Sequence, residues 1–235
     1  MRFSSALVLF AHPDDAEYMC GGTVAGWARE GTDVHYVILT DGSAGSNEPG
    51  ATREEMAVIR EHEQRAAAEV LGVRSLTFLG FRDGELEVNL EARRAVAREV
   101  RRIRPQVLVA PDPSRLWSSS GYINHSDHKA AGQLALCAVM PDSPTRLQFS
   151  ELLDEGFEPY EIPALWLAAE EPDTYVDITK TIDVKLEALT RHQSQHGEAS
   201  APWVRDRARQ MGERAGVEYA EAFRAFVLKE EEEEQ

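Results

Sequence analysis

Hydrophobic and polar positions follow two different periods along this chain. Short apolar runs of strand length occur at residues 5–11, 33–40, 74–79, 106–110, 164–168 and 174–178. Apolar residues with helical spacing follow at 20–30, 53–71, 90–103, 128–140, 179–191 and 201–215. Strands that alternate with helices are typical of a mostly parallel sheet with crossover helices on both faces. We therefore predict a Rossmann-like α/β fold with its active site at the carboxyl ends of the strands.

The length of 235 residues and the hydrophobic content of 43% are enough for one large core. We predict a single domain over residues 1–228, divided into a first half at 1–140 and a second half at 141–228 that several prolines punctuate. Residues 229–235 are predicted to be an acidic disordered tail, because they contain the run Glu230–Glu234.

A polar motif follows the first apolar run, where the sequence reads Leu-Phe-Ala-His-Pro-Asp-Asp-Ala-Glu. Pro13 has no N–H for a strand ladder and disfavours a helical conformation at His12, so the chain must turn there. Asp14 and Asp15 are neighbours whose side chains diverge, so one could bind a cation while the other faces a reacting molecule. The alternative is that one of them only caps the next helix. That alternative leaves His12 unexplained.

A second polar cluster, Asn-His-Ser-Asp-His at residues 124–128, precedes a predicted helix and contains two of the seven histidines. His12 and Asp15 together with His128 make a set of two histidines and one carboxylate. Such a set suits a catalytic zinc ion with an open position for water. Ferrous iron accepts the same ligands.

These two motifs, about 110 residues apart, resemble those of the LmbE-like or PIG-L family of zinc-dependent de-N-acetylases, and the likeness extends over residues 5 to about 195. The resemblance implies removal of an acetyl group from an N-acetylglucosamine-type sugar conjugate. It assigns His12, Asp15 and His128 as metal ligands and Asp14 as general base. His125 would stabilise the oxyanion or protonate the leaving amine, and Asp127 would orient and electrostatically tune His125.

The resemblance also implies residues that shape the substrate site. Arg60 and Asp83 match positions that contact the sugar in this family. Tyr122 lies three residues before His125, whereas some members carry a catalytic tyrosine two residues before the equivalent histidine. Residues 141–228 would form the variable, substrate-shaping half, in which several side chains could contact substrate: Trp166, Tyr175, His192, Gln193 and Trp203. Core packing is the favoured interpretation for the first two.

Two glycine-containing segments flank the first motif. Gly21 and Gly22 lack the spacing of a nucleotide-binding turn and are predicted to allow close packing of the first helix. The Gly/Ser-rich loop at residues 40–52 is predicted to rim the site.

Charge and composition exclude several kinds of partner. The formal charge of −16 disfavours nucleic acid and anionic membrane surfaces, which are themselves negative. No apolar run approaches the roughly 20 residues of a membrane span, and no secretory signal is recognisable. Cys20 and Cys137 are predicted to be reduced, buried thiols, so we expect a cytoplasmic protein. Because family members often form trimers or hexamers, the resemblance also implies a homo-oligomer.

Two other functions compete with the deacetylase. A metal-dependent phosphohydrolase would use similar histidines and carboxylates, but we find ligands for one metal ion rather than two. A non-catalytic, metal-dependent carbohydrate-binding protein would need no base such as Asp14.

Overall fold

Seven strands form one sheet in a computed structural model that describes residues 2–117, 121–169, 171–195 and 197–229. In chain order they are β1 (Ser5–Phe10), β2 (Asp33–Thr40), β3 (Ser75–Phe81), β4 (Val107–Pro111), β5 (Ala164–Ala168), β6 (Thr174–Asp177) and β7 (Ala220–Val227). Their spatial order is β3-β2-β1-β4-β5-β7-β6. β7 pairs antiparallel with β5 and β6, and the other pairings are parallel. The prediction of a mostly parallel sheet is confirmed.

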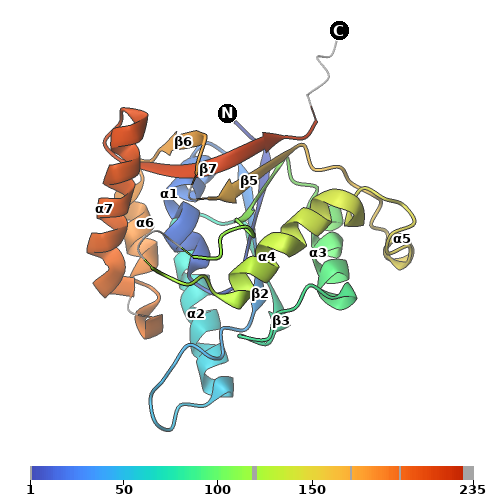
Figure 1. Ribbon diagram of the computed structural model, residues 1–235, viewed down its shortest axis with the longest axis horizontal. Coiled ribbons are helices and arrows are strands. Elements are labelled where there is room, and N and C mark those ends of the chain that lie inside the picture. Colours follow the sequence, from blue (N-terminus) through green and yellow to red (C-terminus); the bar gives the residue numbers. More distant parts are fainter. Residues whose placement is uncertain (1, 118–120, 170, 196, 230–235) are drawn as a thin grey trace.

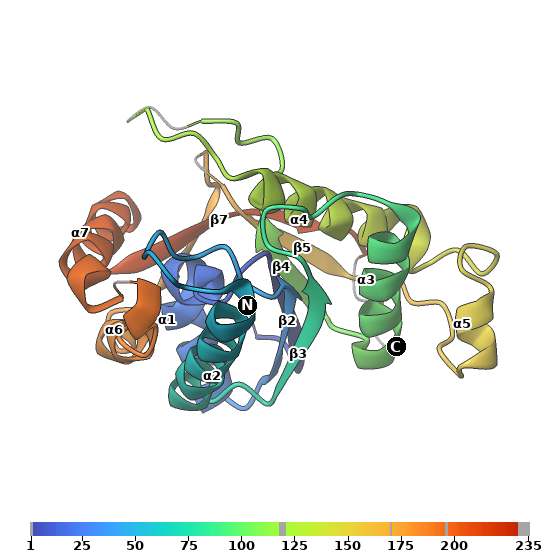
Figure 2. The same cartoon turned by 90° about the horizontal axis from the view of Figure 1, so that it is seen from below.

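Helices cover both faces of this sheet (Figures 1 and 2). They are α1 (Asp15–Arg29), α2 (Arg53–Leu71), α3 (Leu90–Ile103), α4 (Ser126–Cys137), α5 (Glu151–Asp154), α6 (Ile182–Leu189) and α7 (Gly197–Ala215). A π-helical turn at Ala138–Asp142 follows α4, and a 3₁₀ turn at Gln193–Gln195 follows α6.

The central strands are buried on both faces because they lie between two hydrophobic clusters. In β1, Leu7 and Leu9 pack toward α3 and α4, whereas Ala6, Val8 and Phe10 pack toward α1, α2 and α6. The alternation of strand side chains therefore fills two cores at once, which explains why these strands are continuously apolar in sequence. A smaller third cluster joins α6 to α7.

The predicted helices at 53–71 and 90–103 match α2 and α3. Other boundaries differ: α1 begins at Asp15 rather than at residue 20, and α4 ends at Cys137, before the π-helical turn that contains Pro141. The short helix α5 and the strand β7 were not predicted. Most of the predicted acidic tail, residues 230–235, lies outside the described residues.

Two predictions about small residues have clear outcomes. A Cβ atom on Gly22 would lie 2.8 Å from the side chain of Ile178, so the close packing of the first helix is confirmed, with the segment after β6 as its partner. Cys20 is buried, whereas Cys137 is only half-buried, and both are free thiols. Among the described helices, none combines the length and the apolar character needed to cross a membrane.

Candidate metal centre and active site

The two polar motifs meet at the carboxyl ends of the central strands. The chain passes from β1 through β2 to β3 on one side, and then returns to place β4 on the other side of β1. This reversal creates a crevice between β1 and β4, the usual position of a ligand site in such sheets. His12 and Asp15 follow β1, and His128 lies in the first turn of α4, beyond β4.

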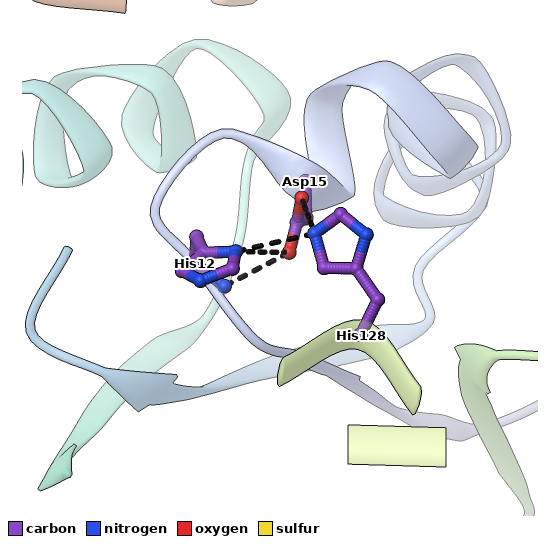
Figure 3. Close-up of side chains that lie close together, drawn as sticks. All are labelled: His12, Asp15 and His128. Carbon is purple, nitrogen blue, oxygen red and sulfur yellow. Dashed lines mark hydrogen bonds and ion pairs between the residues drawn. The ribbon is translucent and has the colours of Figure 1, made fainter. Parts of the chain in front are cut away.

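The ligand atoms of three side chains converge there (Figure 3). His12 Nδ1 lies 3.2 Å from His128 Nε2 and 3.5 Å from Asp15 Oδ2, and His128 Nε2 lies 3.1 Å from Asp15 Oδ1. Two ligand atoms bound at about 2.1 Å in a tetrahedral site lie roughly 3.4 Å apart. The three side chains therefore already have the spacing that a single zinc-sized ion requires.

The second nitrogen of each histidine is hydrogen-bonded in a way that suits a metal ligand. His12 Nε2 lies 3.2 Å from Asp127 Oδ2 and 3.1 Å from Asp83 Oδ1. His128 Nδ1 lies 3.2 Å from Asn124 Oδ1. Acceptors at these positions hold the ring proton on the outer nitrogen, which is Nε2 in His12 and Nδ1 in His128. The inner nitrogen of each ring, which faces Asp15, is then left for a cation. Burial opposes protonation of His12, but its contacts with three carboxylates outweigh burial and raise its pKa well above the ordinary value.

His12, His125 and Asp127 form a second group in which ligand atoms come close enough for a metal ion. Asp127 Oδ2 already accepts the Gly84 N–H at 2.7 Å, and His125 Nδ1 accepts the Asp127 N–H at 3.1 Å. These atoms are therefore engaged within the protein. The geometry favours the set of His12, Asp15 and His128.

Asp127 has a different partner from the one that the resemblance assigned. Its Oδ1 lies 3.9 Å from His125 Nδ1, whereas its Oδ2 bonds to His12. Because His125 Nδ1 accepts a backbone N–H, the proton of the neutral ring is on Nε2. Burial and the neighbouring His12 lower the pKa of His125. In this structure the Asp127 carboxylate therefore contacts the predicted ligand His12 more closely than His125. The role of Asp127 in orienting and tuning His125 stays a prediction.

Asp14 precedes α1 at the capping position, yet its side chain makes no capping hydrogen bond. Its backbone is left-handed, with φ of 104°, which is uncommon for a residue other than glycine. Its carboxylate lies 3.3 Å from an Arg60 nitrogen and lines a cavity. Burial raises the pKa of Asp14 to about 6, although the charge of Arg60 opposes this. The capping alternative therefore does not apply to Asp14.

Arg60 and Asp83, which the resemblance assigns to sugar contact, are both 4% exposed and lie behind the ligands. The Arg60 guanidinium donates to the carbonyls of Pro13 and Gly42, and Asp83 contacts His12 and accepts the Ala44 N–H. Both side chains support the first motif in this structure. Direct contact with a sugar stays a prediction.

The cavity in front of the site has a volume of about 630 Å³, and its floor includes Asp14, Asp15 and His128. Its walls include Tyr18, Arg115, Tyr122, Trp203 and Arg207. Trp203, predicted as a candidate substrate contact, therefore faces the cavity, and so does Tyr122.

Other candidates from the second half of the chain have different positions. Trp166 packs in the core against Trp27 and Phe223, as predicted. His192 is fully buried against Glu17, so it does not face the cavity directly. The predicted rim loop is tied to the site at its start, where Gly42 and Ala44 bond to Arg60 and Asp83.

Asn124 and Gln64 were not predicted as site residues. Asn124 belongs to the same pentapeptide as His128, and Gln64 lies one helical turn after Arg60 on α2. A helix places residues four apart on one face, so the spacing from Arg60 was an available signal for Gln64.

Comparisons with known proteins show the family to which this sequence is similar. The sequence profile of the family described as PIG-L, GlcNAc-PI de-N-acetylase, matches residues 7–139. The chain is 34% identical over 223 residues to diacetylchitobiose deacetylase from Thermococcus kodakarensis, covering 93% of this chain and 81% of that protein.

Two solved structures show the same architecture. N,N'-diacetylchitobiose deacetylase from Pyrococcus horikoshii matches with a TM-score of 0.88 and 33% identity, over 96% of this chain and 84% of that one. GalB, the 4-carboxy-2-hydroxymuconate hydratase from Pseudomonas putida KT2440, matches with a TM-score of 0.79 and 25% identity over 100% of both chains. Since proteins named for two reactions share this architecture, the reaction has to be argued from the site.

Proposed function

The chain belongs to the PIG-L family of de-N-acetylases, and we propose that it uses zinc to hydrolyse the acetamide group of an N-acetylglucosamine-type sugar conjugate. The observation that carries this proposal is the position of Asp14. A half-buried carboxylate lines the cavity beside the three side chains whose ligand atoms converge, and it takes no part in capping the helix that follows. Two similar proteins are named as deacetylases of diacetylchitobiose, which supports a sugar as the substrate.

His12, Asp15 and His128 would hold the ion. Zinc bound by such a set lowers the pKa of water to about 7 and polarises a carbonyl oxygen. Asp14 would then accept a proton from the attacking water. Its raised pKa of about 6 supports this role, because a base with a pKa near the working pH both exists deprotonated and accepts protons effectively.

His125 is the candidate for the opposite side of the reacting carbonyl. Its ring lies edge-on to the ring of His12, with centroids 4.7 Å apart. With Nδ1 occupied by the Asp127 N–H, the Nε2–H remains to donate a hydrogen bond to the oxyanion. The leaving amine would then take the proton that Asp14 accepts from the water. We propose that it acts as a neutral donor, which the lowered pKa supports.

The test is an assay of the zinc-loaded protein with N-acetylglucosamine and its conjugates, followed by detection of free amine and acetate. A phosphohydrolase would release phosphate from sugar phosphates instead, and a carbohydrate-binding protein would bind the conjugates without forming amine. Zinc-loaded protein that forms no amine from any of these conjugates would refute the proposed function.

Replacing Asp14 with Asn separates chemistry from metal binding. The amide keeps the shape of the side chain but cannot accept the proton, so kcat should fall by about 100-fold or more. Zinc content should stay equal to that of the wild type. Near-normal turnover with zinc retained would exclude Asp14 as the base.

The metal ion, the location and the assembly are the finer parts of the proposal. We expect zinc rather than ferrous iron to restore activity to metal-free protein under anaerobic conditions. The cytoplasmic location and the trimer or hexamer implied by the resemblance stay predictions, which fractionation and light scattering check.

A further inference from the structure

The peptide group between Pro13 and Asp14 is held at both of its polar ends by side chains of α2. An Arg60 nitrogen donates to the carbonyl oxygen of Pro13. Gln64 Oε1 accepts the N–H of Asp14 at 2.8 Å. Arg60 and Gln64 lie four residues apart on one face of the helix, so both can bond to the same peptide group.

The side-chain amide of Gln64 is itself oriented from behind. Its Nε2 donates to Glu17 Oε1 at 3.0 Å, and Glu17 Oε2 lies 3.1 Å from His192 Nε2. Glu17, Gln64 and His192 are all 0% exposed. The backbone N–H of Asp14 only donates hydrogen bonds, so the Gln64 oxygen must face Asp14 and its nitrogen must face Glu17. Side chains from α1, α2 and the segment after α6 thus fix one amide.

This arrangement bears on the unusual backbone of Asp14. A residue other than glycine in the left-handed region costs roughly 1 kcal/mol or more, and it persists only where its surroundings impose it. Here the surroundings are the bonds to both ends of the preceding peptide group. In this conformation the Asp14 carboxylate makes no capping hydrogen bond to α1 and lines the cavity.

We propose that Gln64, held by Glu17 and His192, is a positioning residue that keeps the Asp14 carboxylate aligned with the attacking water. The inference rests on the proposed function, in which Asp14 is the base. It makes α2 part of the catalytic support, although Gln64 itself is fully buried.

Gln64→Met tests the inference, since methionine has a similar length and lacks both hydrogen-bonding groups. The kcat of zinc-loaded enzyme should fall by about 10- to 100-fold, with KM within about threefold of the wild type and zinc content unchanged. Hydrogen exchange at the Asp14 amide, followed by NMR, should become faster. The matched control is Gln148→Met, which removes a hydrogen bond to Asp142 at the far side of α3 and should leave kcat and this exchange rate unchanged.

A double-mutant cycle separates positioning from general loss of structure. If Gln64 acts through Asp14, Gln64→Met should lower the residual rate of Asp14→Asn by less than about threefold. A full multiplicative loss in the double variant, or loss of zinc from Gln64→Met, would overturn the inference. If Gln64→Met does not fold, Gln64→Glu takes its place, because it keeps an acceptor for Asp14 but loses the donor to Glu17.

The proposed function fails by a different result in the same experiments. Absence of amine formation by the wild type, or full activity of Asp14→Asn, would contradict the function or the role of the base. Only the inference about Gln64 fails if the wild type forms amine, Asp14→Asn loses activity, and the double-mutant cycle shows independent effects of the two substitutions.

Discussion

Asp127→Asn distinguishes the role that the structure gives Asp127 from the role expected on the resemblance. Asp127 Oδ2 accepts from His12 Nε2 at 3.2 Å and from the Gly84 N–H at 2.7 Å. An asparagine oxygen can keep both contacts, so the substitution mainly removes the negative charge beside the outer nitrogen of His12. A less basic His12 binds a cation more weakly. We therefore expect Asp127→Asn to lower zinc affinity, in contrast to a residue that serves only His125.

The size of the effect follows from the number of carboxylates that face the same nitrogen. Loss of such a partner of a metal-binding histidine lowers metal affinity by about 10- to 100-fold, equivalent to about 1.4 to 2.7 kcal/mol. Asp83 Oδ1 lies 3.1 Å from His12 Nε2 and would still supply a negative charge. Each single substitution, Asp127→Asn or Asp83→Asn, should therefore weaken binding by about tenfold. The double substitution should weaken it by more than the product of the two, because neither charge then remains.

Zinc affinity is measured by competition with a chromogenic chelator at fixed pH. Asp112→Asn is the matched control, because Asp112 also lines the cavity but its Oδ1 accepts from Ser114. That variant should keep wild-type affinity. Unchanged zinc affinity in Asp127→Asn, combined with a large loss of kcat, would refute the assignment to His12 and return Asp127 to His125.

Three further substitutions test the metal site and the packing around it. His128→Ala should have lost most of its bound zinc in metal analysis, because only two ligands remain, whereas His62→Ala on the exposed face of α2 should retain zinc. Full zinc content in His128→Ala would remove His128 from the site. Gly132→Ala would place a Cβ 2.5 Å from the Pro111 carbonyl and should cost about 1–3 kcal/mol in chemical denaturation, whereas Gly26→Ala meets no atom within 4 Å and should not destabilise; equal stabilities would contradict this packing. Lys185→Met leaves the Glu221 carboxylate buried with only backbone N–H partners and should cost about 3–5 kcal/mol, whereas Lys229→Met at an exposed ion pair should cost less than about 1 kcal/mol; a similar small loss for both would show that the buried pair contributes little.

The central parallel strands were predictable because β1, β4 and β5 are almost wholly buried, on both faces of the sheet. Leu7 and Val8 pack into different clusters, so the whole run is apolar and easily recognised. β7 lacks this signal, since Glu221 and Arg224 interrupt its apolar residues and Val227 at its carboxyl end is 65% exposed. The start of α1 was missed for a related reason. Asp15 and Glu17 are polar residues in its first turn, yet both are buried, because Asp15 contacts His128 and Glu17 contacts Gln64.

The same reasoning explains which parts of the site could be predicted. The two motifs gave His12, Asp15 and His128 because metal ligands need particular residue types, and the prediction that they converge needs only the rule that strand ends share one edge. The partner of Asp127 could be identified only once the order of the strands in the sheet was known. Its sequence neighbour His125 seemed the natural partner, but the two residues lie two positions apart at a helix start, where side chains point in different directions. Asp127 instead reaches His12, 115 positions away in the sequence, because β1 and β4 are adjacent in the sheet. Contacts between residues that follow neighbouring strands but lie far apart in the sequence therefore cannot be predicted from a single sequence.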